Sequence, residues 1–244
     1  RIAAPSAAAR RRTPYLELDV SIAVDQVRAL GQALPGTGLH YAVKANPHPR
    51  LLRELYAAGA RFDVASPAEV HAALRAGATP TELVYSNPVK RRDDIGTAYR
   101  LGVRLFAVDS PEETAKVAEA APGAGVLVRL VTSGQGSDWP LSRKYGCSTA
   151  QAAGLLRLAA GHGLDPAGIS FHVGSQQRDP GAWRSPILAS AAVFREARAA
   201  GLRPRLLDLG GGFPALHEGH HPSFAAYGRA IGTALVEAFG AEPP

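Results

Sequence analysis

The sequence has few cysteines, no long apolar runs and few lysines, and each shortage is informative. Among its 244 residues there is one cysteine, Cys147, so no disulfide can form within the chain, and we expect a reducing, cytoplasmic location. No stretch approaches the roughly 18 uninterrupted apolar residues of a membrane-spanning helix. We therefore expect no membrane association. The basic, alanine-rich residues 1–13 are predicted to form a disordered tail, with an organelle transit peptide as the alternative.

The balance of positive side chains is unusual because arginine largely replaces lysine. The 27 lysines and arginines include four lysines, namely Lys44, Lys90, Lys116 and Lys144. The formal net charge is +6, but the arginines are scattered and do not alternate with aromatic residues, so we expect no nucleic-acid partner. Arginine stays protonated in proteins, whereas a desolvated lysine becomes an amine nucleophile. Lys44, at the end of the apolar run from Leu39, is therefore a candidate for forming a Schiff base.

From Gly38 onward, short β-rich runs alternate with helical patterns, which predicts repeated βα units and a parallel sheet. The predicted strands are Leu39–Lys44, Phe62–Ala65, Leu83–Tyr85, Leu105–Val108, Val126–Val131, Ile169–Val173 and Leu206–Leu209. Their spacing favours an α/β fold, the (β/α)8 TIM-type barrel, over residues 38–244, truncated before an eighth strand. The alternative is an open doubly wound sheet of seven strands.

Two segments do not follow this rhythm. Residues 14–37 are predicted to form an N-terminal strand over Pro14–Val20, assignable to a second β-domain, and a helix over Ile22–Leu34. The glycine- and serine-rich loop Ser133–Pro140 is either a mobile lid or a flexible connection.

In such a barrel, reactive side chains lie at the carboxyl ends of several strands. The glycines Gly210, Gly211 and Gly212 follow the seventh predicted strand, where closely approaching backbone N–H groups would bind a phosphate. Ser175 would add a hydroxyl to this phosphate site. His172 is either a core histidine or a flat ring beside a bound ring. Asp63 is either a cap acid or a partner for a charged nitrogen near Lys44.

A reactive lysine, a phosphate site and a stacking imidazole on one rim together indicate an aldehyde cofactor that carries a phosphate. Pyridoxal 5'-phosphate has both groups, and it forms a Schiff base with a lysine. Free lysine has a pKa of about 10.4, so less than roughly one part in a thousand is neutral amine at pH 7. Burial of Lys44 or reaction with the cofactor must supply the difference.

Six spaced motifs resemble one family, the pyridoxal-phosphate-dependent ornithine/lysine/diaminopimelate decarboxylases with an alanine-racemase-like barrel. The motifs are YAVKAN (Tyr41–Asn46), FDVAS with Glu69, YSNPVK (Tyr85–Lys90), RKYG (Arg143–Gly146), FHVGSQ (Phe171–Gln176) and LGGGFP (Leu209–Pro214). They are most similar to bacterial ornithine/lysine decarboxylases. The resemblance implies that Lys44 binds the cofactor covalently and that His172 stacks on its ring, which makes these two the catalytic residues.

The same resemblance implies further roles. Ser175 and Gly210–Gly212 would bind the phosphate, and Asp63, Glu69 and Arg129 would organise the cofactor and its lysine. The implied reaction is decarboxylation of ornithine to putrescine, in polyamine biosynthesis, or of lysine to cadaverine, by a cytoplasmic protein that is a homodimer when complete. No metal is implied.

The sequence also departs from the family pattern. The family's EPGR-type segment and its C-terminal β-domain are not found, so we expect a poor or inactive decarboxylase from this chain alone. Cys147 follows the RKYG motif and so is not the family's catalytic cysteine; we expect a small buried residue. The alternative is a non-catalytic pyridoxal-phosphate-binding or regulatory homologue, although Lys44, His172 and the glycines are retained.

Overall fold

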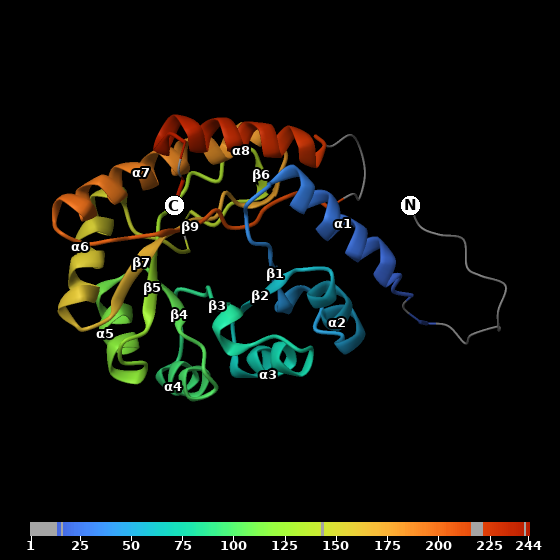
Figure 1. The fold of residues 1–244 in the computed structure, drawn as a ribbon, viewed down its shortest axis with the longest axis horizontal. Coiled ribbons are helices and arrows are strands. Elements are labelled where there is room, and N and C mark those ends of the chain that lie inside the picture. Colours follow the sequence, from blue (N-terminus) through green and yellow to red (C-terminus); the bar gives the residue numbers. More distant parts are fainter. Residues whose placement is uncertain (1–13, 16, 143, 216–221, 242) are drawn as a thin grey trace.

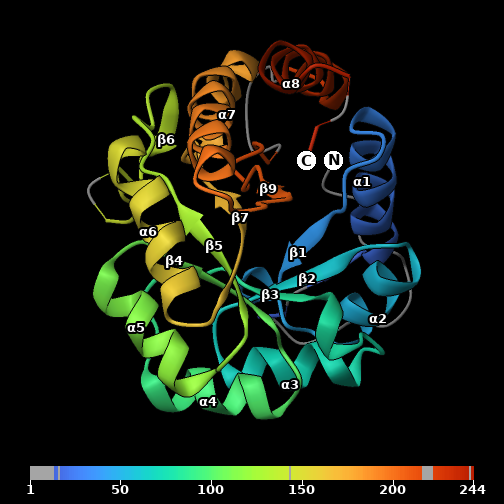
Figure 2. The same cartoon turned by 60° about the vertical axis from the view of Figure 1, so that its left-hand side comes forward.

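Seven parallel strands form one curled sheet, as expected. The computed structural model describes residues 14–15, 17–142, 144–215, 222–241 and 243–244. The strands of this sheet, in spatial order, are β1 (His40–Ala42), β2 (Arg61–Val64), β3 (Leu83–Tyr85), β4 (Leu105–Val108), β5 (Gly125–Arg129), β7 (Asp165–Ser170) and β9 (Leu206–Asp208). The strands lie side by side in the order in which they follow along the chain. In a doubly wound sheet, by contrast, the strand order changes direction at a point inside the sheet. The doubly wound alternative is therefore excluded, and the sheet is most of a barrel (Figure 2).

Helices surround the outside of the curled sheet (Figures 1 and 2). They are α1 (Val20–Ala33), α2 (Pro49–Ala57), α3 (Pro67–Arg75), α4 (Arg92–Arg100), α5 (Pro111–Ala120), α6 (Thr149–Gly161), α7 (Arg184–Ala199) and α8 (Phe224–Phe239). Serine caps begin two of these helices: the Ser66 side chain accepts a hydrogen bond from the N–H of Glu69, and Ser110 accepts one from Glu113. None of the described helices is long and apolar enough to cross a membrane.

The apolar core lies between the sheet and the helices, and this places polar side chains inside the curl. In β2, Phe62 and Val64 are fully buried against the helices. Successive side chains of a strand point to opposite faces, so Asp63 faces the interior. The register pairs Phe62 with Leu83 and Val64 with Tyr85, which continues the apolar outer layer into β3.

The strand predicted over Pro14–Val20 is not formed. The described residues of that segment lie outside any strand, and α1 begins at Val20. The Asp19 carboxylate accepts a hydrogen bond from the N–H of Ser21, which stabilises a helix start. Alternating polarity is weak evidence for a strand when a capping acid follows it directly.

The glycine-rich loop Ser133–Pro140 was predicted to be a mobile lid or a flexible connection, but part of it forms a strand. Its strand β6 (Ser137–Trp139) pairs in antiparallel fashion with β8 (Ser175–Gln177), just after β7. The Gln177 side chain also donates a hydrogen bond to the carbonyl of Gln135, at 2.8 Å. The loop is therefore connected to the segment that carries Ser175.

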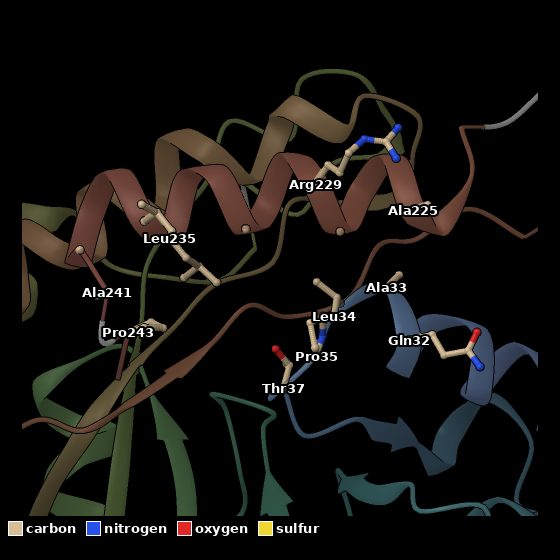
Figure 3. A pocket seen from close by; sticks show the side chains of 14 residues that line it. Gln32, Ala33, Leu34, Pro35, Thr37, Ala225, Arg229, Leu235, Ala241 and Pro243 are labelled. Carbon is tan, nitrogen blue, oxygen red and sulfur yellow. The ribbon is translucent and has the colours of Figure 1, made fainter.

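Strands β1 and β9 are the two edges of the described sheet. Helices α1 and α8 meet beside this opening, where Gly228 packs so closely on the carbonyl of Ala33 that no side chain fits. A cavity of about 610 Å³ lies between the end of α1, helix α8 and the residues after it (Figure 3). Its lining is largely apolar or small, including Leu34, Gly232 and Leu235.

Candidate active site

Most of the predicted site residues lie in or directly after five strands of the curled sheet, whereas Glu69 lies in α3 and Ser175 in β8. Lys44 lies in a 3-10 turn, Val43–Ala45, directly after β1, and Asp63 lies in β2. Arg129 ends β5, and its register partner in β7 is Ser170, which in turn pairs with Asp208 of β9. His172 follows β7, and the glycine loop Gly210–Gly212 follows β9. The fold thus brings these residues to one end of the sheet, as the strand-end argument predicted.

His172 has a fixed orientation and is neutral at pH 7. Its Nδ1 accepts a hydrogen bond from the N–H of Gly174, at 3.0 Å, which leaves the ring proton on Nε2. Its carbonyl accepts a second bond from the Thr132 hydroxyl, at 2.6 Å. Burial, followed by the positive charges of Arg129 and Lys44, lowers the pKa of His172 to about 4. Neutral imidazole offers a flat face to a bound ring.

The loop after β9 accepts glycine alone at two positions. A Cβ at Gly210 would overlap the carbonyl of Phe171, and a Cβ at Gly212 would overlap the carbonyl of Gly174. Both glycines have positive φ, 65° and 111°. A Cβ at Gly211 would lie 3.4 Å from His172 Nε2, so the loop passes beside the imidazole.

The backbone donors of this loop suit an anion only in part. The N–H of Gly210 donates to Asp208 Oδ1, at 2.8 Å, so it is already engaged. Within the described ranges, no hydrogen bond engages the N–H of Gly211 or Gly212. Ser175 is exposed on the neighbouring strand β8. Two free backbone donors, a hydroxyl and an adjacent neutral ring fit a phosphate attached to a flat heterocycle.

Asp208 is a site residue that the sequence argument missed. It ends β9 on the same face as Arg129, and burial raises its pKa while the Arg129 charge lowers it. Its carboxylate fixes the first glycine of the loop through the bond to Gly210. The available signal was an acid at the last position of a short strand, directly before Leu209 and the glycine run.

Lys44 is exposed in the structure. The protein alone therefore does not bury its side chain, and of the two sources of neutral amine named above, reaction with the cofactor remains. Asp63 is not a cap acid, because it lies within β2 and accepts a short hydrogen bond from the Ser86 hydroxyl. Its surroundings raise the pKa of Asp63 to about 6 by desolvation, opposed by the Ser86 hydrogen bond and by the Lys44 charge. Asp63 and Lys44 therefore interact electrostatically.

Glu69 has a local role in the structure. Its carboxylate accepts hydrogen bonds from the N–H of Ala65, at 3.1 Å, and from the hydroxyl of Ser66, at 3.3 Å, which forms a reciprocal cap on α3. Arg129 lies over the Tyr145 ring, 5.2 Å from its centroid, and burial lowers its pKa. A direct contact of either residue with a cofactor stays a prediction. Of the RKYG motif, Arg143 lies outside the described residues.

Cys147 is buried and free, and burial raises its pKa to about 11. The expectation of a small buried residue is confirmed. Such a thiol is protonated at neutral pH and unsuited to act as a nucleophile.

Known proteins share both the sequence and the architecture of this chain. Residues 21–243 match the family described as pyridoxal-dependent decarboxylase, pyridoxal binding domain. The chain is 37% identical over 207 residues to the lysine/ornithine decarboxylase of Selenomonas ruminantium, covering 85% of this chain and 53% of the relative. It is 36% identical to the chloroplastic ornithine decarboxylase of Nicotiana glauca, over 95% of this chain and 53% of the relative. The chain thus spans about half the length of these relatives.

Solved structures agree. A crystal structure of an SrLDC mutant in complex with PLP superposes with a TM-score of 0.89 at 36% identity, over 94% of this chain and 60% of that chain. The lysine/ornithine decarboxylase of Vibrio vulnificus, complexed with putrescine, gives a TM-score of 0.82 at 35% identity, over 89% and 58%.

The curled parallel sheet with a lysine, a neutral imidazole and a glycine loop at one end defines a barrel that binds pyridoxal phosphate. This chain belongs to the pyridoxal-dependent decarboxylase family, in its pyridoxal-binding domain. The predicted fold class, family and cofactor are confirmed.

Proposed function

We propose that this chain binds pyridoxal phosphate through Lys44 and takes part in the decarboxylation of a basic amino acid, with ornithine the first candidate and lysine the second. The single observation that carries the proposal is the junction of the glycine loop with His172, where Gly211 lies beside the imidazole and His172 is held by Gly174. This junction offers a phosphate site and a stacking face at adjoining positions.

Each residue has a role that its surroundings support. Gly211, Gly212 and Ser175 bind the phosphate, and Gly210 shapes the loop through its bond to Asp208. His172 packs flat against the ring. Bound pyridoxal phosphate would supply an aldehyde and a conjugated ring that accepts the electron pair left when a carboxylate departs as CO₂.

Lys44 is the amine that holds the cofactor, and its exposure leaves it accessible to an aldehyde. Asp63 provides a negative charge that balances the Lys44 ammonium, because the two groups interact electrostatically. The positive charge of Arg129 favours the ionised form of Asp208 in the interior of the sheet.

The substrate assignment draws support from relatives. Those compared act, by name, on lysine and ornithine or on ornithine, and one related structure holds putrescine. We extend to the whole protein the proposal of a cytoplasmic homodimer. Its oligomeric state is measurable by light scattering coupled to size-exclusion chromatography.

The test is chemical trapping of the cofactor on this chain. The Lys44 amine condenses with the aldehyde of pyridoxal phosphate with loss of water, and borohydride then reduces the new C=N bond to a stable amine. Peptide mass spectrometry should find the label on Lys44 in the wild type and find none at that position in Lys44→Ala. Lys144→Ala is the matched control, and it should retain the label on Lys44. Labelling spread over several lysines, with none favoured, would reject the assignment.

Labelled CO₂ release from ornithine, lysine and arginine then ranks the substrates. Release from ornithine above lysine and arginine supports the first candidate. Specific trapping on Lys44 without CO₂ release is expected both for the pyridoxal-binding portion of a decarboxylase and for a cofactor-binding homologue without catalysis, whereas CO₂ release from any of the three substrates rejects the homologue.

A further inference from the structure

The contact between Ser86 and Asp63 has no place in the roles described so far. Ser86 directly follows β3, and its hydroxyl donates a short hydrogen bond to Asp63 Oδ1 in the neighbouring strand β2. The register pairs Asp63 with Val84. Because side chains alternate along a strand, Ser86 emerges on the same interior face as Asp63, one step nearer the end of the sheet that carries the site.

The segment that carries Ser86 is held firmly by a buried lysine. The Lys90 ammonium donates to the carbonyl of Asn87, at 3.0 Å, and to the carbonyl of Ala107 in β4, at 2.5 Å. It also lies 2.9 Å from a carboxylate oxygen of Glu113 in α5, and its side chain is 0% exposed. The turn from Ser86 to Lys90 is thereby fixed to β4 and α5, so the hydroxyl of Ser86 is held in place before any ligand arrives.

Asp63 is an acid whose carboxylate interacts electrostatically with Lys44. Desolvation raises the pKa of Asp63 to about 6, and the Ser86 hydrogen bond is the largest opposing influence, ahead of the Lys44 charge. A hydroxyl donor stabilises a carboxylate more than a neutral carboxylic acid. Loss of the hydroxyl would therefore leave Asp63 protonated closer to neutral pH.

We propose that Ser86 is a positioning residue that keeps Asp63 ionised and fixed in orientation within electrostatic range of Lys44. The inference rests on the proposed function, because it deepens the role of Lys44 as the group that holds the cofactor. Ser86 acts through Asp63 and is not assigned a contact with cofactor or substrate.

The first test needs no cofactor. Carbon-13 carboxyl shifts of aspartate, with the Asp63 signal assigned by its loss in Asp63→Asn, give the pKa of Asp63 in the full chain. Ser86→Ala should raise this pKa by about one pH unit, as expected for removal of a hydrogen bond to a charged group. Ser86→Thr, which keeps a hydroxyl, should restore it. Ser86→Cys, a weak donor of similar size, replaces the alanine variant if that variant does not fold and should give a smaller rise in the same direction.

The matched control is Ser190→Ala. Ser190 is buried, whereas Ser86 is half-buried, and it donates its hydroxyl to a carbonyl, that of Pro186 in α7, so it reports the general effect of deleting a hydrogen-bonded hydroxyl. It should leave the Asp63 titration unchanged. Equal Asp63 titration curves in the wild type, Ser86→Ala and Ser86→Cys would overturn the proposal.

The second test separates this inference from the proposed function. Borohydride trapping of pyridoxal phosphate on Lys44, repeated from pH 5 to pH 9, should show an inflection that follows the Asp63 pKa and moves upward in Ser86→Ala. If the wild type is not labelled on Lys44, the proposed function fails while the carboxyl titration still decides whether Ser86 controls Asp63. If the wild type is labelled and the inflection does not move in Ser86→Ala, the positioning role fails and the proposed function stands.

Discussion

Lys44 and Lys90 are two lysines on neighbouring parts of the same sheet end, and their surroundings differ completely. Lys90 is fully enclosed and has three partners, the carbonyls of Asn87 and Ala107 and the carboxylate of Glu113. Lys44 is exposed, and within the described residues no hydrogen bond or ion pair engages its ammonium. An ammonium has three donors. Lys90 uses its donors to connect structural elements, whereas Lys44 retains its donors for chemistry.

The two surroundings also differ in how their charges are balanced. Burial lowers the pKa of Lys90 to about 8, opposed by the charge of Glu113, and a second lysine, Lys116, lies 2.6 Å from the same carboxylate. Around Lys44, by contrast, Asp63 and His172 have pKa values moved toward the neutral form by desolvation. At pH 7 His172 is therefore neutral, whereas Asp63, whose pKa is about 6, is mostly ionised and carries a charge opposite to that of Lys44.

The largest effect expected is the response of Lys44 to a change that keeps its charge. Lys44→Arg should abolish covalent capture of pyridoxal phosphate, because a guanidinium does not lose its proton. The free energy of unfolding should change by less than about 0.5 kcal/mol, since the side chain is exposed. Borohydride trapping and urea denaturation measure the two outcomes. A large loss of stability in this variant would show that Lys44, like Lys90, is structural.

The converse substitution tests Lys90. Lys90→Met should lower the free energy of unfolding by about 3–5 kcal/mol, because it leaves the buried Glu113 without its enclosed partner. Adding Glu113→Leu to the same chain should recover most of that loss, since the buried carboxylate, which then has only the partly exposed Lys116 beside it, is removed as well. Denaturant titration of both variants measures the difference. An unstable double variant would point to packing, and not charge, as the contribution of Lys90.

The third prediction concerns acid titration around Lys44. Desolvation raises the pKa of Asp63 from 3.8 to about 6, so Asp63 contributes stability that is lost as the pH rises through 6. The pKa of His172 falls from 6.5 to about 4, so its contribution is lost as the pH falls through 4. Each contribution is about 3 kcal/mol and the two have opposite pH dependence, so they largely offset each other between pH 4 and 6.

Single variants should expose each contribution. Relative to the wild type, Asp63→Asn should gain stability as the pH rises from 4 to 6, because the opposing influence of Asp63 is gone. His172→Phe should lose stability over the same range, relative to the wild type. Thermal or urea unfolding at four pH values in this window measures both slopes. Two variants with the same slope would contradict the assignment of opposite shifts.

The smallest effect expected is at Lys116, the outer lysine beside Glu113. Its side chain is 25% exposed, compared with 0% for Lys90, so Lys116→Met should cost about 1 kcal/mol or less. This variant should also be more sensitive to salt than Lys90→Met, because the partly exposed pair is screened. Denaturation at low and high ionic strength measures this difference. A cost equal to that of Lys90→Met would mean that burial does not separate the two lysines.

Much of the barrel was predictable from local patterns. Each predicted strand overlaps a strand of the main sheet, although Ile169–Val173 shares only Ile169 and Ser170 with β7. The glycines Gly59, Gly77, Gly102 and Gly201 follow the ends of their helices with positive φ. Such features depend on neighbouring residues in the chain. The strand predicted over Pro14–Val20 was wrong because the prediction used only the alternating polarity of a short window. It did not take into account that Asp19 caps the following helix.

The site was predicted as a set of positions and not as a set of contacts. Strand-end logic found Lys44, Asp63, His172 and the glycine loop, because parallel strands bring their carboxyl ends to one side. It did not find the bond from Gly210 to Asp208, the bond from Ser86 to Asp63, or the exposure of Lys44. These depend on distances between residues that lie far apart in the chain.

The sequence by itself determined the alternation of strands and helices and the residue types that follow each strand, because periodicity and turn chemistry act over a few residues. Only the tertiary structure decided which lysine is enclosed and which is accessible. Lys44 and Lys90 both follow a β-rich run. Lys44 lies within the motif YAVKAN, and Lys90 is the last residue of the motif YSNPVK. The surrounding carbonyls, carboxylates and solvent, which the chain brings together only on folding, give one a structural role and leave the other free to react.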